Sequence, residues 1–219
     1  MINKSTLTFL KHLKDNNSSE WVNEHRADYN SALNDFIVFN EKLISAIGKF
    51  DQKIAKSDLQ AKDCIPRLNR DLRFAKDKSP YKTYLYSIIQ DQGRKSGKAG
   101  YAVVIDPGNC CITCGAFQPD PQRLKELRTE IEYNFDQWSK ITQDKELLAA
   151  FPNGIIAQES LQKVPKGFDP ESPAKEFLKM KGFFVKIDLT ESFLQSKQAI
   201  EEIATKHSTC KNLLDFLNK

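Results

Sequence analysis

The sequence of 219 residues has no run of about 20 apolar residues, the length that a helix needs to cross a membrane. Its first 15 residues, MINKSTLTFLKHLKD, become polar within a few positions and lack the sustained apolar stretch of a secretory signal peptide. These absences predict a soluble, cytoplasmic protein that has no membrane partner.

Familiar catalytic signatures are missing as well. The sequence contains no GxSxG, HExxH or GxGxxG motif. The segment GRKSGKAG superficially resembles a phosphate-binding P-loop, but only three residues separate Gly93 from Gly97, and Ala99 stands where Ser or Thr is required. We interpret it as a basic hairpin loop that is able to fold over a bound anion, and we predict no cofactor.

The sequence gives little support for a metal site or for a set of disulfide bonds. The five cysteines are an odd number, and Cys111 and Cys114 form a lone CxxC in a predicted strand, where residues three apart point to opposite faces. No second CxxC or HxxxH supplies further ligands. The histidines are scattered over predicted helices at His12, His25 and His207. We predict structural cysteines, surface or packing histidines, and no metal site.

Helical spacing of apolar residues dominates the first 48 positions. Ser5 is a candidate cap for a short helix, and Asn17 is a candidate cap for a second helix that continues through Tyr29. A longer amphipathic helix follows and ends near Gly48. Trp21 and the later Trp138 lie among helical apolar positions, which predicts that both belong to the core.

After the basic segment the apolar period changes from helical to two. Three strands with a Pro-Gly turn at 107–108 are predicted, then a helix that begins near Pro121, a short helix around Phe177 and two helices near 192–206 and 208–218. This order predicts an α+β fold in which an antiparallel sheet, a meander around residues 82–118 plus a strand near 182–188, packs against amphipathic helices. No linker is evident, so we predict a single domain over residues 1–219.

The positive charge is concentrated in one part of the chain. The net charge is +4, yet residues 62–98 hold ten of the 33 Lys and Arg residues but only four of the 29 Asp and Glu residues. This stretch therefore carries +6, and the remainder carries −2. A block of like charge is either a solvated surface or a binding site for an anionic partner.

The segment RLNRDLRFAKDKSPYK, residues 67–82, is the centre of this block. Its arginines recur every third residue, a spacing that neither a helix nor a strand gathers on one side, whereas a turn capped by Asn69 or Asp71 would bring several together. Guanidinium forks suit phosphate or carboxylate groups. The predicted anion-binding residues are Arg67, Arg70, Arg73, Lys76, Lys78, Tyr81 and Lys82.

The two aspartates and the tyrosines of this region each have two interpretations. Asp71 and Asp77 either cap turns and neutralise neighbouring arginines, or act as carboxylate partners in chemistry on a phosphorylated substrate. Nearby cations lower the pKa of a carboxyl group, which suits an electrostatic anchor better than a base near pH 7. Tyr81, Tyr84 and Tyr86 are either half-buried sheet residues or platforms on which nucleic-acid bases stack.

The segments RLNRDLRFAKDKSPYKT, AGYAVVIDPG and LQKVPKGFDPESPAKEFLKMKGFFV, with FLKHLKDNNSSEWVNEHRADY before them, resemble the bacterial and fungal family called domain of unknown function 2461. The resemblance covers nearly the whole chain, and it implies a single domain but no particular activity. The family's basic motif falls on Arg67, Arg70, Asp71, Arg73, Phe74, Lys76, Asp77, Lys78, Pro80, Tyr81 and Lys82. Its second motif falls on Val164, Pro165, Lys166, Gly167, Lys179 and Lys181. The resemblance suggests that Lys166, Lys179 or Lys181 converges with the first cluster.

Four functions follow, in order of preference. The first is binding of a small molecule that bears phosphate or carboxylate at the Arg/Lys cluster. The second is an enzyme that acts on a phosphorylated substrate, which requires Asp71 or Asp77 to face the same cavity. The third is nucleic-acid binding, which predicts a long positive groove and an affinity that falls steeply with salt. The fourth is a protein-interaction module, which predicts an exposed apolar patch of several hundred Å². Whether the protein is catalytic stays open at this point.

Overall fold

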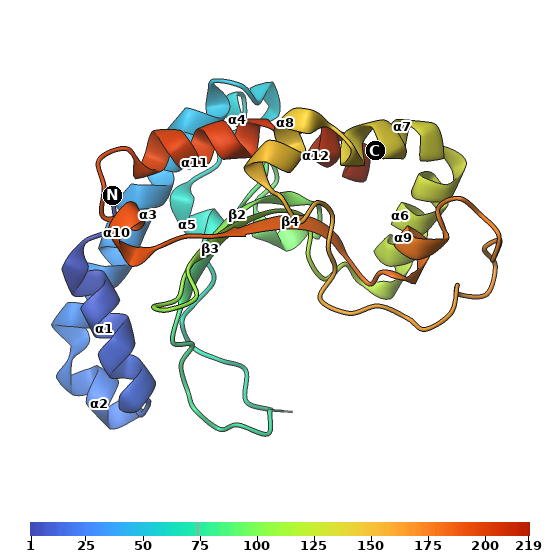
Figure 1. Ribbon diagram of the computed structural model, residues 1–219. Helices are drawn as coiled ribbons and strands as arrows, with labels where there is room; N and C mark the ends of the chain where they lie inside the picture. The colour runs from blue at the N-terminus through green and yellow to red at the C-terminus, as the bar shows by residue number, and fades with distance from the viewer. Residues whose placement is uncertain (74) are drawn as a thin grey trace. The chain divides into compact units, whose positions relative to one another are not determined.

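A computed structural model describes residues 1–73 and 75–219 (Figure 1). These residues group into two compact units. The first unit comprises Met1–Arg94, Ala102–Ile112 and Asp188–Thr205. The second comprises Lys95–Tyr101, Thr113–Ile187 and Lys206–Lys219. The single domain over residues 1–219 stays a prediction.

The first unit begins with three helices that pack together (Figure 1): α1 (Lys4–Asp15), α2 (Ser19–Glu24) and α3 (Arg26–Gly48). Leu7, Leu10 and Leu13 of α1 are buried, as their helical spacing predicts. The predicted cap at Ser5 is wrong, because the helix already begins at Lys4 and its N-cap position is Asn3. Asn3 turns its side chain to Asp35, donating from Nδ2 to Oδ1 at 2.6 Å.

The predicted second helix is in fact two. Ser18, rather than Asn17, is the N-cap of α2, and its Oγ accepts a hydrogen bond from the backbone N–H of Trp21 at 3.1 Å. The helix ends at Glu24, before the predicted end at Tyr29, and α3 continues to Gly48 as predicted. Trp21 is only half-buried and stacks on the His25 ring, so its assignment to the core is wrong in part.

The four strands confirm the predicted α+β fold and its antiparallel sheet (Figure 1). They are hydrogen-bonded in sequence order and comprise β1 (Leu85–Ile89), β2 (Gly100–Ile105), β3 (Cys111–Ala116) and β4 (Phe183–Asp188). The hairpin loop between β1 and β2, which holds the GRKSGKAG segment, contains the 3-10 helix η1 (Arg94–Ser96). Gly108 has a φ of +91° in the Pro-Gly turn between β2 and β3, a backbone conformation that favours glycine.

Close packing of β3 against β4 depends on Gly115. Its φ is +136°, and a Cβ atom at this position would lie 2.2 Å from the carbonyl oxygen of Phe183. Any side chain here would push the two strands apart, because real Cβ atoms do not approach backbone so closely.

The remaining helices complete the two units. Those before the sheet are α4 (Gln52–Ala55) and α5 (Ala61–Cys64). Those after β3 are α6 (Pro121–Tyr133), α7 (Phe135–Thr142), α8 (Lys145–Ala150) and α9 (Lys175–Lys179). The last three are α10 (Glu191–Leu194), α11 (Ala199–Ser208) and α12 (Lys211–Leu217). The predicted helix from Pro121 to Trp138 is broken at Asn134, and the one near 192–206 is divided between α10 and α11.

An aromatic cluster lies at the centre of the second unit. Trp138 of α7 is fully buried, as predicted. Its ring centroid lies 5.4 Å from that of Phe177, 5.8 Å from that of Phe183 and 5.2 Å from that of Phe216. Edge-on and tilted ring pairs at these distances add to the stabilisation that comes from burying apolar area. This cluster joins α7, α9, β4 and α12.

Candidate functional site

The basic segment forms a loop that is closed at its base. An isolated antiparallel bridge joins Asn69 to Tyr81. The backbone N–H of Arg70 donates to the Pro80 carbonyl at 2.9 Å, and the N–H of Lys82 donates to the Leu68 carbonyl at 2.9 Å. The chain therefore leaves and returns at one place, which brings residues 70 and 82 close together although they are 12 positions apart.

Asn17 holds this base against the end of α1. Its Nδ2 donates to the carbonyl of Tyr81 at 2.9 Å, and its Oδ1 accepts from the N–H of Tyr81 at 3.1 Å. The side-chain amide thus bonds to both the backbone N–H and the C=O of Tyr81, as a residue of a neighbouring strand would. The role explains why Asn17 does not cap α2.

An open groove of about 640 Å³ lies beside the loop base in the first unit. Five residues predicted from the basic segment line it: Arg70, Asp71, Asp77, Tyr81 and Lys82. Tyr84, a candidate for base stacking, lines it as well, and four further lining residues were missed: Lys14, Asn17, Ser79 and Thr83. The volume is within the range of small-molecule sites.

Four predicted cations do not line this groove: Arg67, Arg73, Lys76 and Lys78. The guanidinium of Arg73 pairs with Asp71, with Nη2 at 2.6 Å from Oδ2, and the ammonium of Lys78 donates to the Leu72 carbonyl at 3.1 Å. Arg67 and Lys76 are exposed on the surface. Phe74, which belongs to the same motif, lies outside the described residues.

Arg70 is the arginine that the fold directs into the groove. Its Nη1 donates to Asp77 Oδ2 at 2.5 Å and to the Ser79 carbonyl at 3.2 Å. Its side chain is 28% exposed. The Nε and Nη2 groups have no hydrogen-bond partner among residues 1–73 and 75–219, so Arg70 retains donors for a ligand.

Both aspartates of the groove are held in the ionised form. The side chain and backbone N–H of Ser79 and the guanidinium of Arg70 hold the pKa of Asp77 well below its usual range. The hydrogen bonds from Arg73 lower the pKa of Asp71. These carboxylates organise the loop, and their protonation state near pH 7 does not suit a general acid.

Lys82 lies in a strongly positive environment. Its ammonium donates to the carbonyls of Arg67 at 2.7 Å and Asn69 at 3.1 Å. Partial burial, followed by the nearby charges of Arg94 and Arg70, lowers the pKa of Lys82. An anion placed beside Lys82 would offset this repulsion between cations.

Tyr81 and Tyr84 line the groove, whereas Tyr86 does not. Tyr81 is 7% exposed and takes part in the loop base. Tyr84 and Tyr86 are half-buried, with ring centroids 5.9 Å apart and an interplanar angle of 36°. Burial raises the pKa of Tyr86.

The lysines of the second motif belong to the second unit. Lys179 pairs with Glu176 at 2.7 Å, and Lys181 pairs with Glu159 at 2.7 Å. Lys166 is exposed next to Gly167. Their convergence with the basic loop stays a prediction.

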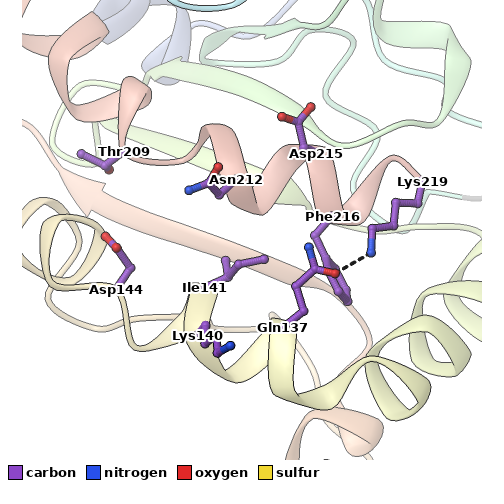
Figure 2. Close-up of a pocket in the computed structure, with 9 residues that line it drawn as sticks. All are labelled: Gln137, Lys140, Ile141, Asp144, Thr209, Asn212, Asp215, Phe216 and Lys219. Atoms are coloured by element: carbon purple, nitrogen blue, oxygen red, sulfur yellow. Dashed lines mark hydrogen bonds between the residues drawn. The ribbon is translucent and has the colours of Figure 1, made fainter.

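The second unit has a groove of about 370 Å³ along α7 and α12, shown in Figure 2. Several of its polar residues have partners within the protein. Lys219 donates to Gln137 Oε1 at 2.7 Å (Figure 2). Asp144 caps α8 by accepting from the N–H of Leu147 at 2.9 Å. Asp215 pairs with Lys211 on the same helix. We assign no function to this groove along α7 and α12.

Thiol and imidazole groups are placed for packing. All five cysteines are buried, and burial raises the pKa of Cys64 to about 12 and that of Cys110 to about 11. His207 packs against the Tyr101 ring, and His12 is exposed. No group of three or more His, Cys, Asp or Glu residues is arranged to hold a metal ion in the part of the chain that the structure describes.

No described helix is both long enough and apolar enough to span a bilayer. Comparison with curated proteins and with solved structures gives no match. A family model described as a conserved hypothetical protein, DUF2461, matches residues 5–216 and thus includes the basic loop and the groove. The chain therefore belongs to the DUF2461 family of conserved hypothetical proteins.

Proposed function

We propose that the groove beside the basic loop binds a small molecule that bears a phosphate or carboxylate group. One observation carries this proposal: Arg70 and Lys82 line the same groove from the two chain ends of the loop base, together with Lys14 of α1. The unpartnered Nε and Nη2 groups of Arg70 form one side of a fork that suits two oxygens of an anion.

The charge balance of the groove supports an anionic ligand. Three cations face two carboxylates among its lining residues, and both carboxylates are already paired with arginines. Lys82, whose pKa is lowered by burial and by neighbouring cations, gains most from a nearby negative charge. The anionic group of the ligand would accept hydrogen bonds from the Nε and Nη2 groups of Arg70, which have no acceptor among the described residues.

An enzyme that acts on a phosphorylated substrate is the second candidate, because Asp71 and Asp77 line the same groove. Their contacts favour binding over turnover, since Asp71 accepts from Arg73 and Asp77 accepts from Ser79 and Arg70. The lowered pKa of each carboxyl group also makes it a weak base towards a substrate.

The experiment is a thermal-shift screen of inorganic sulfate, phosphorylated metabolites, nucleotides and oligonucleotides. A ligand at about 100 times its Kd should raise the unfolding temperature by roughly 5–10 °C. Arg70→Ala should abolish the shift. Arg67→Ala is the matched control, because it removes the same charge from the same segment, and its exposed side chain does not line the groove.

The outcomes separate the candidate functions. Equal loss in both variants would mean that only overall charge matters, and the groove would not be a site. Stabilisation by oligonucleotides alone, steeply dependent on salt, would favour nucleic-acid binding instead. Turnover of a phosphorylated hit that Asp77→Asn abolishes, with binding retained, would favour the enzyme.

A further inference from the structure

A second site is built around Arg128 in the second unit, separate from the basic loop. It is a groove of about 360 Å³. Its apolar walls are formed by Phe117, Pro119, Pro121, Leu124 and Leu161.

The groove has a defined frame. Pro121, Leu124 and Arg128 lie three and four positions apart along α6 and so share one face of that helix. Leu161, which also lines the groove, belongs to a short paired segment in which its N–H donates to the Lys179 carbonyl at 2.8 Å. Phe117 packs its ring on Phe184 at 4.9 Å and still exposes 47% of its surface.

Arg128 is the unusual member of this groove. The residue is only 8% exposed, and its Nη2 donates to the Met180 carbonyl at 2.8 Å. Its Nε is buried without a hydrogen-bond partner in residues 1–73 and 75–219, and no carboxylate there pairs with it. Glu132, one helical turn further on, instead accepts from the N–H of Asp169 at 3.2 Å.

A buried arginine without a counterion is unfavourable, because a guanidinium stays ionised and loses its hydration. Burial accordingly lowers the pKa of Arg128. Buried charges in proteins are ordinarily paired, so the missing partner points to a ligand.

The other polar residues of the groove have partners inside the protein. Lys181 pairs with Glu159 at 2.7 Å, and Gln118 Nε2 donates to Gln158 Oε1 at 2.5 Å. Of the charges that line the described groove, Arg128 alone lacks an opposite charge. The site therefore has room for one negative charge on an otherwise apolar ligand.

We propose that this groove binds a small monocarboxylic acid, with the carboxylate on Arg128 and an aromatic or branched aliphatic body against Phe117, Leu124 and Leu161. A carboxylate fits better than a phosphate dianion. One guanidinium balances one charge, and the second cation nearby is already neutralised by Glu159.

The test measures Kd by calorimetric titration with 3-phenylpropionate, 4-methylpentanoate and benzoate on the intact chain. The neutral 3-phenylpropanamide and inorganic phosphate are the comparison ligands. At least one acid should bind at least 10 times more tightly than the amide and than phosphate. Arg128→Leu should weaken the binding of that acid by about 10- to 100-fold, as expected for loss of a hydrogen bond to a charged group.

Two further variants separate binding from folding. Lys125→Leu removes an exposed charge from the same helix and should leave the Kd of the acid unchanged. Arg128→Leu should unfold close to the wild-type temperature, because removal of an unpaired buried charge offsets the loss of the hydrogen bond to the Met180 carbonyl. Arg128→Lys keeps the charge without the planar fork and should bind the acid at intermediate strength.

Several results would overturn the proposal. Equal affinity for the acid and its amide would show that the charge of the ligand is not recognised. An unchanged affinity in Arg128→Leu would show that the acid binds elsewhere. Failure of every acid to bind below 10 mM would count equally against it, as would a large drop in the unfolding temperature of Arg128→Leu. Because Arg70 and Arg128 belong to different grooves, this test is independent of the one at the basic loop.

Discussion

Asp77 and Arg70 form an ion pair across the basic loop, with Nη1 at 2.5 Å from Oδ2, while Ser79 donates from its Oγ to Oδ1 of the same carboxylate at 2.7 Å. The pair fixes the guanidinium at the groove but also occupies part of it. Asp77 is therefore both the anchor of Arg70 and the competitor of any incoming anion.

Replacing Asp77 with Asn should strengthen anion binding. The amide keeps the shape of the side chain but no longer attracts Arg70, so the Kd for sulfate should fall by about two- to fivefold. Calorimetric titration of sulfate into the wild type and Asp77→Asn checks this. Asp58→Asn is the control, because Asp58 is exposed and its carboxylate has no partner among the described residues. A higher Kd for sulfate in Asp77→Asn would contradict this prediction and show that Asp77 matters more as the anchor of Arg70 than as a competitor of the anion.

The same carboxylate predicts an acid-sensitive part of the stability. Ser79 and Arg70 depress the pKa of Asp77 in the folded state, so the native protein binds fewer protons than the unfolded chain. This contribution is present above the unfolded value of about 3.9 and is lost as the pH falls through the folded pKa. Urea unfolding between pH 2 and 6 should show a difference between wild type and Asp77→Asn that shrinks with acid. A difference that does not vary with pH would contradict the assignment.

The Asn17 clamp should be required for both stability and binding. Asn17→Ala removes two hydrogen bonds and leaves the backbone N–H and C=O of Tyr81 without these partners. This loss should cost about 1–3 kcal/mol in the free energy of unfolding. Sulfate should also bind more weakly, because the loop base is no longer held beside α1. Asn23→Ala, at an exposed position of α2, is the matched control. Equal stability of the two variants would rule out the clamp.

Lys82 predicts an alkaline limit for anion binding. Its pKa is lowered in the ligand-free protein, so it loses its proton at a lower pH than an ordinary lysine, whose pKa is about 10.4. Sulfate keeps a fixed charge, and its affinity should be constant near pH 7 and fall as the pH rises through the pKa of Lys82. Lys82→Arg should remove the decline, since arginine stays protonated. Superimposable pH profiles for the two proteins would exclude Lys82 from the site.

Local patterns in the sequence were enough for most of the fold. All four strands were predicted from short apolar, β-rich runs, and alternation marked β1, since burial on one face of a sheet leaves a period of two in the chain itself. Helix boundaries were less certain. Asn17 and Ser18 are equally suitable caps, and the choice between them depends on Tyr81, which is 64 positions away. The break at Asn134 likewise gave no local signal.

The site was predictable only in part, for a related reason. The charge block pointed to Arg70 and Lys82, but Lys14 lines the groove through tertiary packing of α1, which no local pattern reports. Spacing alone did not show which arginine faces inward. Arg128 had no signal at all, because an arginine in an amphipathic helix ordinarily lies on the solvent side.

Trp138 should be the most sensitive position of the second unit. Its ring contacts Phe177, Phe183 and Phe216, so Trp138→Ala removes the centre of the aromatic cluster and should cost about 3–5 kcal/mol in the free energy of unfolding. Trp138→Phe should cost less, because it keeps an aromatic ring and removes an Nε1 group that is buried without a partner in the described chain.

Circular dichroism during urea unfolding measures both Trp138 variants, with Trp21→Ala as the control. Trp21 is half-buried on the His25 ring, so its loss leaves a smaller cavity and should cost less than that of Trp138. If Trp138→Phe were as destabilising as Trp138→Ala, the indole itself, rather than the packing of any aromatic ring, would be what holds α7 against α12.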